Sequence, residues 1–409
     1  MADILFLAHR IPYPPDRGDK IRSWNMLKHL AGLARVHLVC FADNAEDAAH
    51  LPALRAALGA GLGEAHVEIR RKGRLAAAAQ ALATGKPVSL ALFGSGGMRA
   101  FVRHQLAGPE IGTVFAFSGQ MAQFVPADAH QRFVMDFVDL DSAKFGQYAA
   151  AASGPMAWAH RREEKRLFAF ERATAARAGA SLFVSEAEAD LFRAKAGLSG
   201  ADIRAIQNGI DLEYYDPRRD FARPAAAGAG PLILFTGQMD YSPNVAAVTA
   251  FAAEVMPLVL AERPDARFVV VGRKPTDAVR SLASRPGVDV VGEVADVRPW
   301  LAAADVVVAP LRIARGIQNK LLEAMAMARP AVATSAAFTG IDAVAGRDLL
   351  VADDAAGQAQ AVLGLLADSA KRLRIGNAAR ARMEKSYRWP AKLAPLSELL
   401  GLPDRREAA

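Results

Sequence analysis

The chain reads DVVVAPLRIARGIQNKLLEAMAMARPAVAT from Asp305 to Thr334, and this stretch has the pattern of a strand, a loop, a helix and a second strand. Its first seven residues are mostly apolar and β-branched, as expected of a strand that is buried on both faces of a parallel sheet. The residues after the loop are strong helix formers, and Asn319 is of a type that favours the N-cap position. The stretch therefore predicts one strand–helix–strand unit of a parallel sheet.

The same alternation of apolar runs and amphipathic segments extends along the whole chain. In the first half, the predicted strands are Ile4–Ala8, Val36–Phe41, Val67–Ile69, Thr113–Phe117, Phe133–Phe137 and Ser181–Val184. In the second half, they are Leu232–Gly237, Arg267–Gly272, Val288–Val294, Asp305–Leu311, Pro330–Thr334 and Asp348–Asp353. We predict an α/β fold of two Rossmann-like doubly wound domains in series, with a ligand between the carboxyl ends of the two sheets.

A segment without hydrophobic periodicity separates the two series of strands. It runs from Asp216 to Pro231 and is rich in Pro, Gly, Ala and Arg, a composition typical of a linker. We predict an N-terminal domain over residues 1–215, a linker over 216–230 and a C-terminal domain over 231–387. A last helix at about 388–402 is predicted to return to the first domain.

Composition limits the classes of function. The 409 residues carry a formal net charge of +7, which favours an anionic partner such as a nucleotide or a membrane surface. No nucleic-acid-binding motif is present, so we expect no nucleic acid partner. The single cysteine, Cys40, fits a reducing compartment. With no signal peptide and no uninterrupted apolar run of about 18 residues, we expect a cytoplasmic protein.

The loop and helix that follow Leu311 are predicted to bind phosphate. A strand–loop–helix unit places backbone N–H groups and the positive end of the helix dipole at the carboxyl end of the strand. Arg312, Arg315 and Lys320 would add cationic donors there, and the Glu323 carboxylate could accept hydrogen bonds from ribose hydroxyls. An ordinary helix start with surface charges has the same spacing, and spacing alone does not separate the two interpretations.

The run GIQNKLLEAMA resembles the donor-binding motif of glycosyltransferase family 4, and Gly316 and Glu323 match it. Arg315 is a departure, because it stands where the family has a first Glu near the sugar hydroxyls. The resemblance implies the GT-B fold, with two domains facing a central cleft, a nucleotide-sugar donor, retention of anomeric configuration, and no metal or other cofactor. The catalytic residues that we expect are Arg315, Lys320 and Asp139. The expected donor-binding residues are Glu323, Gly316, Ile317, Gln318, Asn319, Arg312, Gly237 and Arg273.

Three further segments are similar to the family. They are HRIPYPPDRGDKIRSWN, which opens the chain, FVSEAEADLF from Phe183 to Phe192 and IQNGIDLEYYDP from Ile206 to Pro217. The first implies a phosphate or acceptor loop of Asp16, Arg17, Gly18 and Arg22. As a set, the motifs look like the sugar transferases of bacterial PEP-CTERM/exosortase exopolysaccharide systems. This implies a saccharide or polyprenyl-linked saccharide acceptor and peripheral contact with the inner face of an anionic cytoplasmic membrane.

The acidic segment DFVDLDSAKFGQY, from Asp136 to Tyr148, stands where many members of the family carry a histidine near the sugar. Asp136, Asp139 and Asp141 lie close together in sequence, so mutual repulsion would raise the pKa of at least one of them. Lys144 is positioned to pair with them. A functional carboxylate group and an acidic loop that caps the next helix are equally compatible with the sequence.

Two other features are interpreted as structural. His9 has no metal-ligand spacing and is assigned to packing or to the surface, and the basic run from Arg70 to Arg74 favours a solvated helix face. Two rival functions stay open. A nucleotide-sugar 2-epimerase of the same fold would change the donor without an acceptor, and an inactive nucleotide- or carbohydrate-binding module would bind without turnover.

Overall fold

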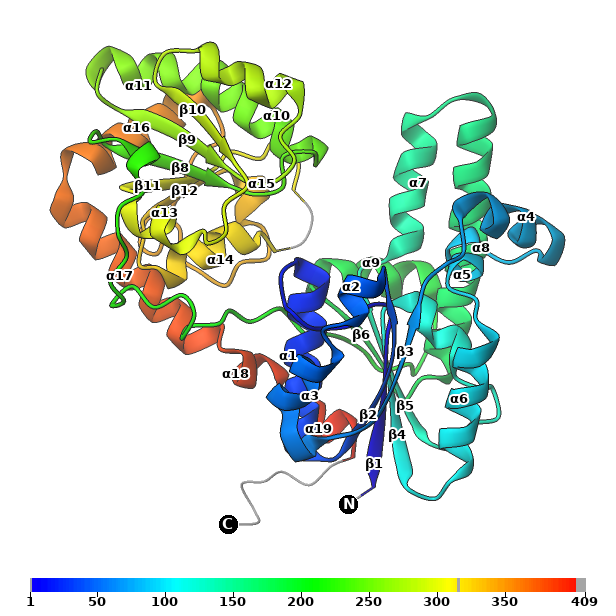
Figure 1. Ribbon diagram of the computed structural model, residues 1–409. Coiled ribbons are helices and arrows are strands. Elements are labelled where there is room, and N and C mark those ends of the chain that lie inside the picture. The colour runs from blue at the N-terminus through cyan, green and yellow to red at the C-terminus, as the bar shows by residue number, and fades with distance from the viewer. Residues whose placement is uncertain (1, 315–316, 402–409) are drawn as a thin grey trace. The chain divides into compact units, whose positions relative to one another are not determined.

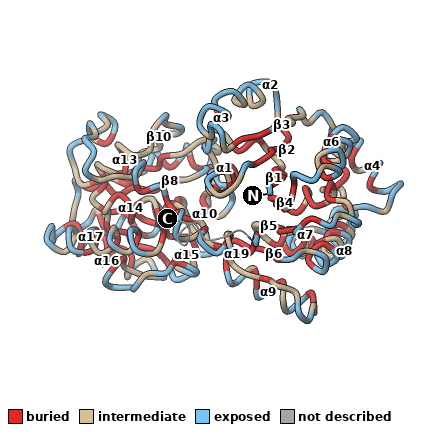
Figure 2. Tube along the Cα trace, turned by 90° about the horizontal axis from the view of Figure 1, so that it is seen from below, coloured by how far each residue is buried: buried red, intermediate tan, exposed pale blue. Residues whose placement is uncertain are grey.

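The computed structural model describes residues 2–314 and 317–401, and Figure 1 shows their helices and strands. The chain forms two compact units. The N-terminal unit contains Met1–Gln207 together with the returning segment Leu393–Ala409, and the C-terminal unit contains Asn208–Lys392. In both units the strands form the buried centre, coloured red in Figure 2, and most exposed residues lie on helices and loops.

The N-terminal unit is built on a parallel sheet. The strands of its described residues are β1 (Asp3–Ala8), β2 (Val36–Ala42), β3 (Leu62–Ile69), β4 (Ile111–Phe117), β5 (Arg132–Val138), β6 (Ala180–Phe183) and β7 (Ile203–Ala205). They lie in the order β3-β2-β1-β4-β5-β6-β7. β1 pairs on one side with β2 and on the other with β4, so the strand order reverses beside β1. Ligands of doubly wound sheets bind outside the carboxyl ends at such a reversal.

Two consecutive helices of the N-terminal unit, α7 and α8, pack side by side as a helical hairpin (Figure 1). The helices of the unit are α1 (Gly18–Leu33), α2 (Ala45–Ala48), α3 (Leu51–Leu58), α4 (Arg74–Thr84), α5 (Val88–Leu92), α6 (Gly96–Ala107), α7 (Asp141–Ala151), α8 (Gly154–Arg177), α9 (Glu186–Ala196) and α19 (Pro395–Leu399). Helix α18 (Trp389–Leu393) carries the chain from the C-terminal unit back to this one.

A buried ion pair joins three elements of the N-terminal unit. Arg22 of α1 donates from Nε to Oδ2 of Asp136 in β5 at 2.9 Å, and from Nη1 to the carbonyl oxygen of Ile206 at 2.7 Å. Both charged side chains are fully buried. Burial raises the pKa of the Asp136 carboxyl, and the Arg22 guanidinium acts against that shift.

The C-terminal unit repeats the design with a second parallel sheet. Its described strands are β8 (Leu232–Thr236), β9 (Arg267–Val271), β10 (Val288–Gly292), β11 (Val306–Ala309), β12 (Ala331–Ala333) and β13 (Leu350–Val351). Their order is β10-β9-β8-β11-β12-β13, so the reversal lies between β8 and β11. The helices are α10 (Ser242–Ala250), α11 (Met256–Glu262), α12 (Asp277–Arg280), α13 (Arg298–Ala303), α14 (Asn319–Ala326), α15 (Ser335–Phe338), α16 (Ala355–Ala367) and α17 (Ser369–Ser386).

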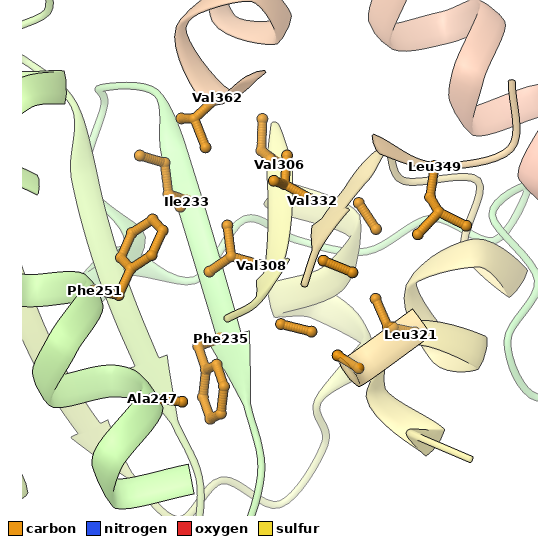
Figure 3. Packing of buried hydrophobic residues seen from close by; sticks show 14 of the residues in the cluster. Ile233, Phe235, Ala247, Phe251, Val306, Val308, Leu321, Val332, Leu349 and Val362 are labelled. Atoms are coloured by element: carbon orange, nitrogen blue, oxygen red, sulfur yellow. The ribbon is translucent and has the colours of Figure 1, made fainter. Parts of the chain in front are cut away.

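The core of the C-terminal unit explains why its strands are so apolar. Ile233, Phe235 and Val308 point from the sheet into one cluster with Phe251 and Val362 of the covering helices (Figure 3). The helical run Ser242–Glu262 is the one helix in the described part of the chain that is long and apolar enough to cross a membrane. Because Phe251 and its apolar neighbours fill this core, the composition of the run is that of a core helix.

The predicted pair of α/β doubly wound domains of the GT-B class is confirmed, and every predicted strand overlaps an observed one. The predicted domain limits differ from the structure, which divides the chain after Gln207. The segment 216–230, interpreted as a linker, is packed within the C-terminal unit. Ala227 is buried there, and Arg223 donates to the carbonyl oxygens of Gly228 and Gly230. The hydrogen bonds from Arg223 to backbone oxygens therefore fix the segment 216–230, although its composition alone indicates flexibility.

We expect Arg22→Met to lower the free energy of unfolding by about 3–5 kcal/mol, because it leaves the Asp136 carboxylate buried without its partner. Urea unfolding measures this change. The control is the double variant Arg22→Met/Asp136→Leu, which removes both charges and is expected to recover part of the loss. A double variant no more stable than Arg22→Met would contradict the assignment of the cost to an unpaired charge.

Candidate functional site

The loops after β8 and β9 meet at the carboxyl edge of the C-terminal sheet, and two glycines allow their contact. A Cβ at Gly272 would lie 1.6 Å from the carbonyl oxygen of Gly237, so no other residue fits there. Gly237 has φ +156° and donates its N–H to the carbonyl oxygen of Val271 at 3.1 Å. Two glycines thus bring backbone groups together at the carboxyl end of β8, beside the strand reversal where doubly wound sheets bind ligands.

Lys320 brings a buried amine to this loop. Its Nζ donates to Oδ1 of Asn244 at 2.7 Å and lies 4.1 Å from the centre of the Phe235 ring. A Cβ at Gly237 would be 3.2 Å from the same Nζ, which places the amine against the Gly237 backbone. Burial lowers the pKa of Lys320 to about 7, and the Glu323 carboxylate acts against this shift. A bound anion would favour the charged form of such an amine.

Glu323 lies one turn further along α14 and is partly buried. The Tyr215 hydroxyl donates a hydrogen bond to its carboxylate. Burial raises the pKa of the Glu323 carboxyl, and it also raises the pKa of Tyr215 well above its usual value. The tyrosine therefore stays a donor, and the remaining lone pairs of Glu323 can accept from a ligand hydroxyl.

The other predicted donor-binding residues are only partly brought together. Arg312 is exposed and donates to the Glu254 carboxylate, which offsets its charge. Arg273 follows β9 and donates to the Gln238 side chain at 3.4 Å, beside the Gly237 loop. Ile317 lies near the loop after α15, where a Cβ on Gly340 would be 3.8 Å from it. Arg315 and Gly316 lie outside the described residues.

The start of α14 corrects one prediction. The N-cap is Gln318 and not Asn319, which is the first helical residue, and no side chain caps the helix. The Gln318 carbonyl oxygen instead accepts from the N–H of Leu321 at 2.9 Å. Propensity favours Asn at the cap, but burial of Lys320 and Leu321 sets the position of the first turn.

The N-terminal unit contains a separate cavity of about 610 Å³ along the carboxyl edge of its sheet. The lining residues come from the ends of β1, β3, β4 and β5, from the starts of α1, α4 and α7, and from the end of α5. They are His9, Arg10, Asp19, Arg70, Lys72, Gly73, Arg74, Leu92, Phe93, Phe117, Ser118, Gln120, Phe137, Val138, Asp139, Asp141 and Lys144. This volume is in the range of small-molecule sites.

Two strained residues lie in the wall of this cavity. Ser118, after β4, has φ +74°, and Val138, at the end of β5, has φ +70°. A β-branched residue at positive φ costs on the order of 1–3 kcal/mol. The N–H of Val138 donates to Oδ1 of Asp136 at 3.0 Å. The N–H of Ser118 donates to the backbone carbonyl oxygen of Asp136 at 2.8 Å. Strain maintained in this way is typical of ligand sites.

The predicted acidic segment divides into two parts. Asp139 and Asp141 line the cavity, and Lys144 donates to them at 2.8 and 3.0 Å, so the expected pairing is confirmed. Burial lowers the pKa of Lys144, but the two carboxylates together outweigh it and the pKa is raised. Asp136, in contrast, is not a lining residue, because it is buried against Arg22.

The structure corrects one residue of the predicted phosphate or acceptor loop, and the other three stay predictions. Arg22 is buried in its ion pair and cannot face a ligand. Arg17 donates to Asp43 at 3.1 Å, and Gly18 is the first residue of α1. Asp16 is largely exposed, with its carboxylate 3.9 Å from Lys20. None of these four residues lines the cavity that the described residues form.

His9, Arg10, Arg70 and Arg74 are lining residues that the sequence assigned to packing, to the surface or to no role. The His9 ring stacks on Phe117, and its Nε2 lies 3.2 Å from Oδ2 of Asp19. His9 follows β1, so its position at the carboxyl end of a central strand was a signal that its side chain reaches the site. Among the residues that the structure describes, no group of three or more His, Cys, Asp or Glu side chains is arranged to hold a metal.

Sequence comparisons place a known domain on the C-terminal unit. Residues 230–368 match the family model for glycosyl transferases group 1. A phosphatidyl-myo-inositol mannosyltransferase of Mycolicibacterium smegmatis is 33% identical over 200 residues, which are 46% of this chain and 49% of that protein. The chain thus matches about half the length of that relative. Glycosyltransferases are therefore the enzymes that this chain is similar to in sequence.

Structural comparisons cover both units. Anabaena HepE, solved in complex with UDP and glucose, has a TM-score of 0.64 at 16% identity, covering 98% of this chain and 100% of HepE. Sucrose-phosphate synthase of Thermosynechococcus elongatus has a TM-score of 0.68 at 17% identity, covering 100% of this chain and 99% of its own. At these identities the likeness establishes the fold.

We expect the stability of the wild type, relative to Lys320→Met, to rise between about pH 7 and pH 10. The pKa of Lys320 is about 7 in the folded state and has its usual value of 10.5 in the unfolded chain. Only the unfolded state therefore binds this proton in that window. The difference in the free energy of unfolding should increase by at most about 1.4 kcal/mol per pH unit. Urea unfolding of both proteins at pH 7, 8 and 9 measures it, and a difference that does not change with pH would contradict a buried neutral lysine.

Proposed function

We propose that this chain, whose C-terminal unit carries a glycosyltransferase group 1 domain, transfers a sugar from a nucleotide-sugar donor to a saccharide acceptor. One observation carries the proposal. A buried lysine and a glycine-lined backbone meet at the strand reversal of that domain, where doubly wound sheets bind nucleotides.

The donor diphosphate would bind against the Gly237 loop and the start of α14. Lys320 supplies a positive charge there, and Arg273 lies beside the same loop. Glu323 would accept from ribose hydroxyls, because its partner Tyr215 leaves carboxylate lone pairs available. The order of these groups along α14 supports a ligand whose phosphates lie at Lys320 and whose ribose lies one turn further along.

The proposed reaction forms a bond between an acceptor oxygen and the anomeric carbon and breaks the bond from that carbon to the phosphate oxygen. The acceptor proton goes to the departing diphosphate. Lys320 and backbone N–H groups would stabilise the charge that develops on the leaving group. We propose retention of configuration on the family resemblance, with the nucleotide-sugar as co-substrate and no resident cofactor or metal.

We also propose that the acceptor is linked to a polyprenyl lipid in polysaccharide synthesis, and that the N-terminal unit contacts an anionic membrane. Support comes from α8, where Trp158 is 61% exposed and Met156 is 59% exposed. Arg161, Lys165 and Arg166 line a groove with Trp158. Exposed aromatic and apolar side chains flanked by cations are typical of membrane-surface helices.

We expect one of UDP, GDP or ADP to raise the melting temperature of the wild type, and to raise that of Lys320→Ala and Glu323→Ala much less. At a nucleotide concentration of 100 Kd, the stabilisation is about 2.7 kcal/mol. Glu384→Ala is the matched control, because Glu384 is an exposed carboxylate of the same unit that pairs with Arg380, and it should keep the full response.

With the matching nucleotide-sugar, Lys320→Ala should lower kcat/KM about a hundredfold, for a loss of about 3 kcal/mol of transition-state stabilisation. Near-normal turnover in both Lys320→Ala and Glu323→Ala would contradict the proposed donor site. Nucleotide binding without transfer or hydrolysis would favour an inactive binding module, and a change in the donor without an acceptor would favour an epimerase.

We expect the double variant Met156→Ala/Trp158→Ala to bind vesicles containing phosphatidylglycerol about tenfold more weakly than the wild type, through lost apolar burial. Sedimentation with these vesicles measures the binding. Leu373→Ala removes an exposed apolar side chain of α17 and is the control. Equal binding to neutral phosphatidylcholine vesicles, or an equal loss in Leu373→Ala, would contradict a specific anionic membrane face.

A further inference from the structure

The basic run after β3 forms one end of the N-terminal cavity. Arg70, Lys72, Gly73 and Arg74 line it, whereas the exposed Arg71 does not. Arg71 is exposed before α4 begins, and Arg74 is exposed as the first residue of α4, so the interpretation of a solvated helix face fits Arg74 among these residues. Arg70, Lys72 and Arg74 line a cavity whose lining also includes Asp139 and Asp141.

Most of the cationic side chains at this cavity already pair with other groups of the protein. Arg70 donates to Asp43 at 2.9 Å and lies over the Phe93 ring, and Arg10 donates to both Asp19 and Asp43. These guanidinium groups are neutralised by carboxylates and hold the ends of β1 and β3 together.

The amine of Lys72 is also occupied, because it donates to the carbonyl oxygens of Ala91 and Gly94 at 3.1 and 3.0 Å and to Gln80. Arg74 differs from every other basic residue of the lining. Within residues 2–314 and 317–401, no hydrogen bond or ion pair engages its guanidinium. It is exposed, and it is the first residue of α4, whose N-terminal end has no side-chain cap.

The opposite end of the cavity has a different chemistry. Asp139 and Asp141 lie there with Lys144, at the end of β5 and the start of α7. Carboxylates of this kind accept hydrogen bonds from sugar hydroxyls. Between the two ends, the buried rings of Phe93, Phe117 and Phe137 form the floor of the cavity, and the His9 ring stacks on Phe117.

The two ends are far enough apart for a ligand larger than one sugar ring. β3 and β5 are separated by four strand spacings in the order β3-β2-β1-β4-β5. At about 4.8 Å per spacing, this is about 19 Å along the carboxyl edge of the sheet. A saccharide with hydroxyls at one end and an anionic group at the other has both the length and the charge pattern of this cavity.

We propose that the cavity of the N-terminal unit is the acceptor site, and that it selects an anionic saccharide, such as a sugar phosphate or a uronic acid, through Arg74. Asp139 and Asp141 bind the hydroxyls of that saccharide. Arg10, Arg70 and Lys72 are positioning residues, because they hold the strand ends and the loop that present Arg74. This inference rests on the proposed function, since it identifies the substrate class of the same transfer.

Isothermal titration with glucose 6-phosphate and with glucose, two probes small enough to occupy the Arg74 end of the cavity alone, tests the proposal at 0.15 M salt. We expect the wild type to bind glucose 6-phosphate at least tenfold more tightly than glucose, as a charge-assisted hydrogen bond provides. Arg74→Ala should remove most of that preference. Arg71→Ala, which removes the same charge from the neighbouring residue outside the cavity, should change the affinity less than twofold. Lys320→Ala should leave it unchanged.

Each contrary result overturns the proposal. An equal loss of affinity for glucose 6-phosphate in Arg74→Ala and Arg71→Ala would mean that general surface charge attracts the probe. A loss of affinity in Lys320→Ala would place the probe in the donor site. Equal affinity for the two sugars, or no measurable binding of glucose 6-phosphate, would also overturn it. The thermal response of Arg74→Ala to nucleotide is recorded in parallel. If that response persists while the sugar preference is absent, the anionic acceptor is wrong and the proposed transferase stands.

Discussion

The buried pair of Arg22 and Asp136 is the constraint on which the N-terminal unit depends. A buried arginine needs a carboxylate and further acceptors, and here it obtains them from β5 and from the segment after β7. The same carboxylate holds the N–H of Val138 at 3.0 Å, which fixes the positive φ at the end of β5. The direction in which the chain leaves β5, and hence the place of Asp139, follows from this one ion pair.

The C-terminal unit has a comparable constraint of opposite character. Gly272 and Gly237 allow two loops to touch, and Lys320 fills the space beneath them with a charge that burial disfavours. Asn244 and the Phe235 ring offset only part of this cost. A lysine kept with a pKa of about 7 is destabilising unless an anion is bound, and sites with such trade-offs between stability and binding are common in enzymes.

Sequence patterns predicted the two sheets well, because strands buried on both faces are apolar and β-branched over their whole length. They failed where the outcome depends on tertiary contact. Arg22 and Asp136 are 114 residues apart, so nothing near either one indicates that they pair. The segment 216–230 has the composition of a linker, yet the acceptors of Arg223 fix it. Arg71 and Arg74 look alike in sequence, and only the direction of the chain after β3 distinguishes them.

The net charge of +7 is a poor guide to where an anion binds, because most cations near both candidate sites are paired. Arg10, Arg17 and Arg70 converge on Asp43, and Arg312 pairs with Glu254. Paired cations stiffen the strand ends but offer little charge to a ligand. Recognition must then depend on the few cations that the fold leaves uncompensated. Among the described residues these include Lys320, which burial holds near neutrality, and Arg74, which no carboxylate engages. Arg273 and Lys72 also lack a carboxylate partner, but each donates to neutral oxygens of the protein. Lys320 and Arg74 belong to different units, so under the proposed function the donor and the acceptor would be recognised by cations of different units.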